Sequence, residues 1–341
     1  MIRSQIYSNA IFLLLLVFIV FFTAYFVGWR DLSIGADSRV YAIMFENFNL
    51  SDPINTDPAY HYFMYFFKYM GLDYQYMFAT HFIITFFLLL SSFVNFSASS
   101  NVFLKTEVYK LFILFLFIFS SSWFLVATTN GLRQGLGLAF VFYGMSLYFK
   151  NKYIILPVIA FTVACFFHKT ILLLIPLLFF VAFSKIKIHF FALFLLLLLI
   201  GYALSFNEQL IESVSLTFNV SLYKDILLYG LDSPWYGFIP MFAVYTAFWF
   251  YLGYFLLIFG FITQEEKIKL VFCLKLYAVL CMYYFIFGFG GYSNRWGVAA
   301  WLFIPILQAV IVTTSKLPLS LQFSLCLLSV FSYSKYLYIL Q

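Results

Sequence analysis

Long apolar runs, most of them about as long as a membrane-spanning helix, recur from one end of this chain to the other. Only short polar segments separate them, and none is long enough for a soluble domain. Since a helix needs about 20 apolar residues to cross the hydrocarbon core, the pattern predicts an all-α polytopic membrane protein with about 11 transmembrane helices (about 10–12). The predicted spans are residues 6–28, 74–96, 110–128, 132–149, 153–167, 170–184, 188–206, 240–262, 270–288, 297–314 and 319–338.

The spans at 153–167 and 170–184 are short for a full crossing. They form either tilted helices or a re-entrant pair that meets at His168. The first apolar run, Ile6 to Val27, is long for a signal peptide and has no A-x-A-like cleavage site, so we expect a membrane helix there. We therefore expect one membrane domain over residues 1–341.

Two polar segments, about 29–73 and 207–239, are longer than the others. Each mixes polar residues with amphipathic pieces, such as Ser38 to Phe48 and Pro58 to Met70. Amphipathic pieces of this length are typical of short helices that lie at a membrane interface. We expect such helices in both segments, covering the outer mouth of the domain.

Composition and charge agree with the hydropathy pattern and add an orientation. The chain is 65% hydrophobic and 9% charged, with a mean hydropathy of +1.00. Lysines mark the short cytoplasmic loops when the N-terminus is placed inside. Four of the five arginines and all seven aspartates then fall on the outer side. The inner lysines are Lys105, Lys110, Lys150, Lys152, Lys185, Lys187, Lys267, Lys269 and Lys316.

Cations stand at the outer starts of three predicted helices. Arg133 begins the fourth, His168 and Lys169 precede the sixth, and Arg295 lies just before the tenth. A helix N-terminus is already partly positive, so cations at three such ends indicate a bound anion, which guanidinium groups grip bidentately. The alternative is that each arginine snorkels alone to the interface.

Polar neighbours extend this set. Asn130, Arg133, Gln134 and Gly137 are spaced i, i+3, i+4 and i+7, which predicts one helix face with two amides, a guanidinium and a gap. The loop GGYSNRWG pairs Tyr292 with Arg295 and supplies Ser293 or Asn294 as a helix cap.

The first outer segment supplies the acidic candidates. Asp37 either caps a helix that starts at Ser38 or serves the site, and Asp57 precedes a proline at a plausible helix start. Arg30 leaves the first helix, while Tyr41 faces either solvent or the site; Arg39 looks dispensable. Of the histidines, we expect His61 to be exposed at the interface, and His81 to be packed or interfacial.

The chain lacks the sequence motifs of several classes of enzyme. The chain has no P-loop, GxGxxG, GxSxG or HExxH motif, and no DxD-like pair in an outer loop, which argues against nucleotide-dependent chemistry. Its four cysteines lie in apolar runs without metal-ligand spacing. We expect no metal site and no cofactor, and nothing points to nucleic acid.

Several of these segments together resemble the EpsG/Wzy group of polysaccharide polymerases, which make O-antigen, capsular polysaccharide or exopolysaccharide. The matching stretches follow that family's order and cover nearly the whole chain. The N-x-x-R helix followed by a short pair broken at His168 is the most specific part. One departure is Asp57, where the family often has glutamate. The stretches are WRDLSIGADSRVY, TDPAYHYFMYFFKYMGLDY, NGLRQGLGLAFVFYGMSLYFKNKY, FFHKTILLLIP and GYSNRWG.

The resemblance implies a metal-independent glycosyl transfer on the periplasmic side of the bacterial inner membrane, by an enzyme similar to GT-C glycosyltransferases. A growing glycan leaves undecaprenyl diphosphate for the free end of another lipid-linked repeat unit. The implied partners are undecaprenyl-diphosphate-linked oligosaccharides, the lipid bilayer, a chain-length regulator and a flippase.

A diphosphate leaving group needs positive charge, and the attacking hydroxyl needs a base. Arg133 and Arg295 are predicted to bind the diphosphate, and Arg30 either joins them or orients Asp37. His168 is the first choice of base, because imidazole titrates near neutral pH, with Asp37 and Asp57 as alternatives. Further predicted substrate-binding residues are Asn130, Gln134, Lys169, Tyr41, Tyr292 and Asn294.

Three other functions stay open. A lipid-linked oligosaccharide flippase also needs interior cations, but in both halves of a cavity and usually with repeat symmetry. A membrane O-acyltransferase also uses an outward histidine, but takes its acyl donor from the cytoplasmic side. An O-antigen ligase shares the polymerase chemistry and differs in its acceptor.

Overall fold

The computed structural model describes residues 2–49, 57–97, 107–151, 153–183, 185–228, 237–291 and 293–316, and the single positions 324 and 327. Across these residues the regular secondary structure is helical, apart from an isolated bridge between Ile262 and Ser315. The described chain divides into two compact units at Leu172 and Leu173. The prediction of an all-α membrane protein is confirmed at this level; that of a single domain stays a prediction.

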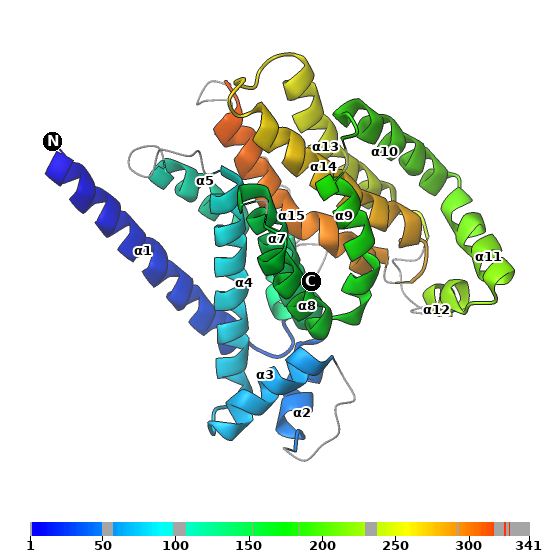
Figure 1. Cartoon of the computed structure of the whole chain (residues 1–341). Coiled ribbons are helices and arrows are strands. Elements are labelled where there is room, and N and C mark those ends of the chain that lie inside the picture. Colours follow the sequence, from blue (N-terminus) through cyan, green and yellow to red (C-terminus); the bar gives the residue numbers. More distant parts are fainter. Residues whose placement is uncertain are drawn as a thin grey trace. The chain divides into compact units, whose positions relative to one another are not determined.

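The first unit is built around two neighbouring long helices, α4 and α7 (Figure 1). α4 packs against α1 and α7, and α7 packs against α8. Phe78, Phe82, Phe86, Leu89 and Phe93 of α4 are fully buried, since their spacing keeps them on one face. The helices of this unit are α1 (Ile2–Gly28), α2 (Ser38–Glu46), α3 (Pro58–Tyr69), α4 (Tyr74–Ser97), α5 (Glu107–Phe119), α6 (Ser122–Thr129), α7 (Leu132–Asn151) and α8 (Ile155–Phe167), followed by a 3₁₀ helix (Lys169–Leu173).

In the second unit, Thr246 of α13 is hydrogen-bonded to both α14 and α15. It accepts hydrogen bonds from the Trp301 indole of α15 at 2.6 Å and, through its carbonyl oxygen, from the Tyr277 hydroxyl of α14 at 2.8 Å. These contacts fix α14 and α15 against α13. The helices of this unit are α9 (Ile175–Phe183), α10 (Ile188–Ala203), α11 (Phe206–Phe218), α12 (Leu222–Leu228), α13 (Pro240–Ile258), α14 (Lys267–Phe287) and α15 (Ser293–Thr314).

Fewer helices qualify as membrane spans by length and composition than the sequence pattern predicts. Four described helices do so, namely α4, α13, α14 and α15, and the number rises to six if each of two bent pairs is one span. The pairs are α5 with α6, bent by 65°, and α10 with α11, bent by 86°. The predicted count of about 11 is therefore not confirmed. The predicted span 319–338 lies outside the described residues except at two positions.

The breaks in these pairs have local causes. The predicted span 110–128 is interrupted because Ser121 caps α6, its hydroxyl accepting from the Phe124 N–H at 3.3 Å. The predicted span 188–206 ends at Ala203, and Ser205 adopts a positive φ of 59° before α11 starts. The predicted span 170–184 is a 3₁₀ helix followed by α9.

The two expected helices of the first outer segment are confirmed as α2 and α3. The apolar face of α2 buries Tyr41 and Phe45, and that of α3 buries Tyr60 and Met64. Both faces join one cluster with residues of α4, α7 and α8. This cluster fixes the N-termini of α2 and α3 close to the start of α7, where the candidate chemistry lies.

Close helix packing explains why α7 carries glycines. A Cβ at Gly135 would collide with the Ala127 carbonyl of α6, and one at Gly137 would lie 2.5 Å from the Ile171 side chain and 3.0 Å from the Ala164 carbonyl of α8. The predicted gap beside Arg133 at Gly137 is therefore occupied by neighbouring protein. The prediction that Gly137 leaves a gap on a polar helix face is therefore wrong, because α7 packs closely against its neighbours at this glycine.

We expect Gly135→Ala to lower the free energy of unfolding by about 1–3 kcal/mol, because the added methyl group forces α6 away from α7. Thermal unfolding of the detergent-solubilised protein measures this effect. Gly131→Ala is the matched control, since a Cβ there meets nothing within 4 Å. Equal melting temperatures for the two variants would contradict the packing argument.

Candidate active site

Three helix ends of the first unit meet at one carboxylate. Asp57 is the residue before α3, Arg133 lies in the first turn of α7, and His168 is the residue after α8. Pro58 at the first helical position starts α3, as the sequence predicts. The contact brings together residues that are 76 or more positions apart in the chain.

Asp57 uses its carboxylate to join these segments rather than to cap its own helix. Its Oδ2 lies 2.9 Å from Arg133 Nη1 and 3.6 Å from His168 Nδ1. Its Oδ1 accepts a hydrogen bond from the backbone N–H of Lys169 at 3.2 Å. The Asp57 side chain is only 8% exposed, against 31% for Arg133 and 22% for His168. The carboxylate is thus buried, while the cation and the imidazole remain reachable.

The surroundings of Asp57 favour its ionised form. Burial by itself would raise the pKa of the carboxyl, but the contact with His168, the Lys169 N–H and the charge of Arg133 together hold that pKa below its usual value. A carboxylate whose pKa is lowered is a weaker general base than an ordinary aspartate. It is better suited to orienting its neighbours.

The depressed pKa has a consequence for stability. An aspartate that is more acidic in the folded state contributes stability above its unfolded pKa of about 3.9, and this contribution is lost as the pH falls through the lower folded pKa. The wild type should therefore melt at a higher temperature than Asp57→Asn at neutral pH, and the difference should start to shrink below about pH 4 and be lost once the pH is below the folded pKa. Melting curves of both proteins across this range test the pairing. A difference that is independent of pH would contradict it.

A second set of contacts fixes the first outer segment to the end of α6. Arg30 donates to the Val27 carbonyl through Nη1, and through Nη2 to the Ser38 hydroxyl at 2.8 Å and the Thr129 carbonyl at 2.9 Å. Its guanidinium also lies 4.6 Å from the centre of the Phe78 ring. Burial lowers the pKa of Arg30 to about 10, so the group is still charged at neutral pH.

Asn130 and Asp37 belong to this second set. The Asn130 side chain accepts a hydrogen bond from the backbone N–H of Asp37 at 2.6 Å. Asn130 is the C-cap of α6, and α7 begins only at Leu132. The prediction that Asn130 shares a helix face with Arg133 is therefore wrong, because the chain breaks at Asn130–Gly131. Asp37 does precede α2, but its side chain makes no capping hydrogen bond there.

Two tyrosines interact with Arg133. The Tyr41 hydroxyl is hydrogen-bonded to the Arg133 guanidinium, so Tyr41 faces the site and not solvent. Its ring meets that of Tyr60 edge-on at 5.6 Å. Tyr60 is 1% exposed, and burial raises its pKa well above the usual value, so its hydroxyl stays protonated. By contrast, Arg39 is exposed.

Several buried polar atoms here lack a hydrogen-bond partner. They are Arg30 Nε, Tyr60 Oη and Arg133 Nε, whereas His168 Nδ1 faces the Asp57 carboxylate at 3.6 Å. Buried polar groups are usually satisfied, so a group of unsatisfied atoms needs an explanation. Arg133 is paired with Asp57, and its charge acts on the buried Tyr60 hydroxyl. Their donors fit a ligand rich in acceptor oxygens, such as a phosphate.

Four of the other predicted residues are Lys169 and Gln134 of the first unit and Asn294 and Arg295 of the second. Lys169 contributes its backbone N–H to Asp57 while its side chain is exposed, and Gln134 is half-buried on α7. Arg295 is exposed in the first turn of α15, next to Asn294, whose buried Oδ1 has no partner. Both belong to the second unit. Tyr292 lies outside the described residues.

The sequence analysis gave three contributors no role in the site and misplaced a histidine. Ser38 and Thr129 bind Arg30, and Tyr60 interacts electrostatically with Arg133. Of the three, only Tyr60 could have been predicted from the sequence, because it lies three residues after Asp57 on the apolar face of a predicted helix. His61 is buried against Phe48, with ring centres 4.9 Å apart, and is not exposed as expected. His81 is packed, as predicted, with Nε2 at 2.7 Å from the Leu132 carbonyl.

Comparison with known proteins gives one result. The profile of the EpsG family matches residues 13–341. Neither a search of curated proteins nor a search of solved structures returned a significant match. The family match extends over nearly the whole chain and includes every residue of the cluster around Asp57. The chain therefore belongs to the EpsG family.

Proposed function

We propose that this chain is a glycosyltransferase that polymerises oligosaccharide repeat units carried on undecaprenyl diphosphate. Membership of the EpsG family supports a polymerase-type function in the synthesis of exopolysaccharide or O-antigen. The observation that carries the proposal is the cluster of Asp57, Arg133 and His168, where one buried carboxylate holds a guanidinium whose Nε has no partner and lies beside an imidazole.

In the proposed reaction, Arg133 binds the diphosphate of the donor. One Nη atom is held by Asp57, which fixes the guanidinium plane, and Nε is buried without a partner. A charged donor held in place by its neighbours stabilises negative charge as it develops on the leaving group, without first having to reorganise. The bond between the donor sugar and the diphosphate breaks, and undecaprenyl diphosphate leaves with the electron pair.

His168 acts as the base toward the acceptor hydroxyl. Asp57 lies next to Nδ1, which keeps that nitrogen protonated and leaves Nε2 as the proton acceptor. The acceptor oxygen forms the new glycosidic bond as its proton moves to Nε2. Asp57 is the weaker choice of base, because its carboxylate is buried, paired and acidic. Asp37 remains the alternative, and Asp37→Asn tests it.

The finer points of membrane placement are part of the same proposal. We infer a bundle of about 11 spans with a GT-C-like architecture in a bacterial inner membrane, with the site facing the periplasm. The lysine distribution supports this, because Asp57, Arg133 and His168 all fall on the side opposite to the lysine-rich loops.

The decisive experiment uses purified protein in detergent, a synthetic undecaprenyl-diphosphate repeat unit and EDTA, without nucleotide. A ladder of products that grows by one repeat unit per step is the expected result. If no ladder forms, but the protein moves labelled lipid across vesicle membranes, the chain is a flippase and the proposal is wrong. Transfer to a different lipid acceptor, without a ladder, would instead indicate a ligase.

A further inference from the structure

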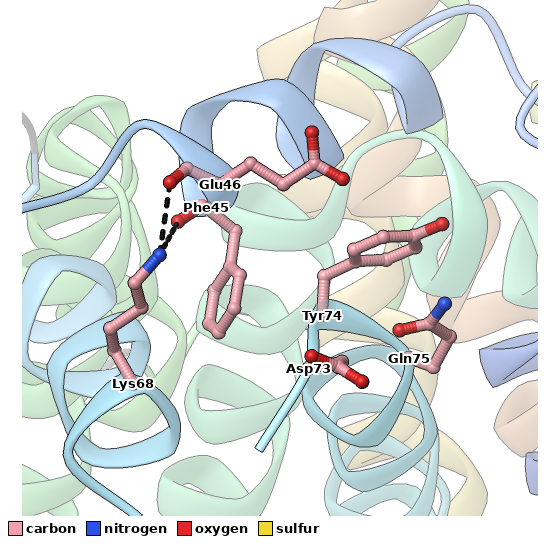
Figure 2. Close-up of a pocket in the computed structure, with 6 residues that line it drawn as sticks. All are labelled: Phe45, Glu46, Lys68, Asp73, Tyr74 and Gln75. Atoms are coloured by element: carbon pink, nitrogen blue, oxygen red, sulfur yellow. Dashed lines mark hydrogen bonds between the residues drawn. The ribbon is translucent and has the colours of Figure 1, made fainter. Parts of the chain in front are cut away.

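A polar pocket lies at the opposite end of α2 and α3 from the candidate active site, within the same unit. Both helices start at the site, where Asp37 and Asp57 precede them, and both end at the pocket. The start of α4 closes its other side (Figure 2). Its volume is about 410 Å³, within the usual range of about 300–1,000 Å³ for small-molecule sites. The lining residues are Phe45, Glu46, Lys68, Asp73, Tyr74 and Gln75.

Lys68 is fixed by the protein itself. Its ammonium donates to the Phe45 carbonyl at 3.2 Å and to the Glu46 carbonyl at 2.9 Å, as Figure 2 shows, and so satisfies the C-terminal end of α2. It also lies 5.3 Å from the centre of the Phe45 ring. With two of its three donors used on carbonyl groups, Lys68 is a structural part of the wall.

The other lining groups are suited to hydrogen bonding with a ligand. Glu46 and Asp73 are exposed carboxylates, and Gln75 has a buried Oε1 with no partner. Tyr74 adds an aromatic ring and a hydroxyl. Two carboxylates and one lysine give the pocket a net negative charge, which disfavours the binding of a phosphate. Its polar wall also disfavours the binding of a lipid chain. Acceptor groups beside an aromatic ring match a polyhydroxylated ligand without acidic groups.

We propose that this pocket binds a non-acidic sugar of the lipid-linked glycan, away from the sugars that react. This inference rests on the proposed function, because that function supplies the glycan. α3 has 12 residues, so at about 1.5 Å per residue the pocket lies about 18 Å from Asp57 along the helix. A glycan of several sugars can reach from Asp57 to the pocket, and it then lies along α2 and α3. The pocket then selects the repeat unit, and the cluster at Asp57 performs the transfer.

The test uses a double variant, Glu46→Gln with Asp73→Asn, which keeps the shape of the pocket and removes its two negative charges while Lys68 stays. The charge-matched control is Glu212→Gln with Glu265→Gln, two exposed glutamates of the second unit. The probe is the oligosaccharide released by mild acid from the polysaccharide of cells that express this chain. Binding to the detergent-solubilised protein is followed by saturation-transfer NMR, with inorganic diphosphate as a competitor.

We expect the double variant to bind the oligosaccharide at least about tenfold more weakly than the wild type, and the control to bind it normally. Inorganic diphosphate should not displace the oligosaccharide from the wild type. In the polymer assay, KM for the lipid-linked repeat unit should rise about tenfold with little change in kcat. Equal binding by wild type and double variant, or no binding by the wild type, overturns the inference. If no polymer forms, but the double variant alone loses binding, the proposed function fails and the glycan pocket stands.

Discussion

Arg133→Ala is expected to abolish polymer growth, with a loss of at least about 10²–10³-fold in rate. Removal of one fixed donor from a site of developing negative charge has an effect of that size. The substitution also removes the Nη1 contact at 2.9 Å, which leaves the Asp57 carboxylate buried without its main cationic partner. Breaking a fully buried ion pair typically costs about 3–5 kcal/mol. Since Arg133 is 31% exposed and Asp57 keeps the Lys169 N–H and His168, the single variant should lose less stability than that, together with its activity.

A double variant separates these two effects. Arg133→Ala with Asp57→Asn removes the buried charge, so most of the lost stability should return while polymer growth stays absent. Arg133→Lys keeps the charge without the planar fork and should retain part of the activity. Arg39→Ala, at an exposed arginine of the same outer segment, is the control and should grow polymer normally. Ladder formation and melting temperature are measured for each protein.

Polymer growth by the folded double variant would contradict the role of Arg133. A normal ladder at a normal melting temperature for Arg133→Ala would contradict both its catalytic and its structural role.

His168→Ala is expected to reduce the rate by about 10²–10⁴-fold, the usual contribution of a general base. Binding of the lipid-linked donor should change little, because Arg133 and its contact with Asp57 remain. Added imidazole should restore part of the rate, because a free base can then accept the proton of the acceptor hydroxyl. Initial rates with and without imidazole, together with KM for the donor, test this role.

The control for His168 is His189→Ala, which removes an exposed histidine hydrogen-bonded to Tyr254 in the second unit. It should be as active as the wild type and insensitive to imidazole. If His168→Ala retains full activity while Asp37→Asn does not, Asp37 is the base and the assignment of His168 is wrong. A rise in KM alone would show that His168 binds substrate and does not transfer protons.

The class of the fold and much of the site could be predicted from the sequence, because each depends on local patterns. Apolar runs of about 20 residues predict membrane helices, and α2 and α3 follow from apolar positions repeating with the helical period. Asp57, Arg133 and His168 were candidates because charged residues in so apolar a chain are costly and mark function.

The tertiary structure alone decided which of these residues lie in contact with one another. Asp57 was an alternative base in the sequence, and only its contacts with Arg133 and the Lys169 N–H show a carboxylate held in its ionised form. Asn130 and Gly137 match one helical face by spacing, yet Asn130 ends α6 and Gly137 packs against α8. The spacing of apolar residues predicts which face of a single helix is buried. Ion pairs between residues 76 positions apart depend on how several helices pack, which no local pattern encodes.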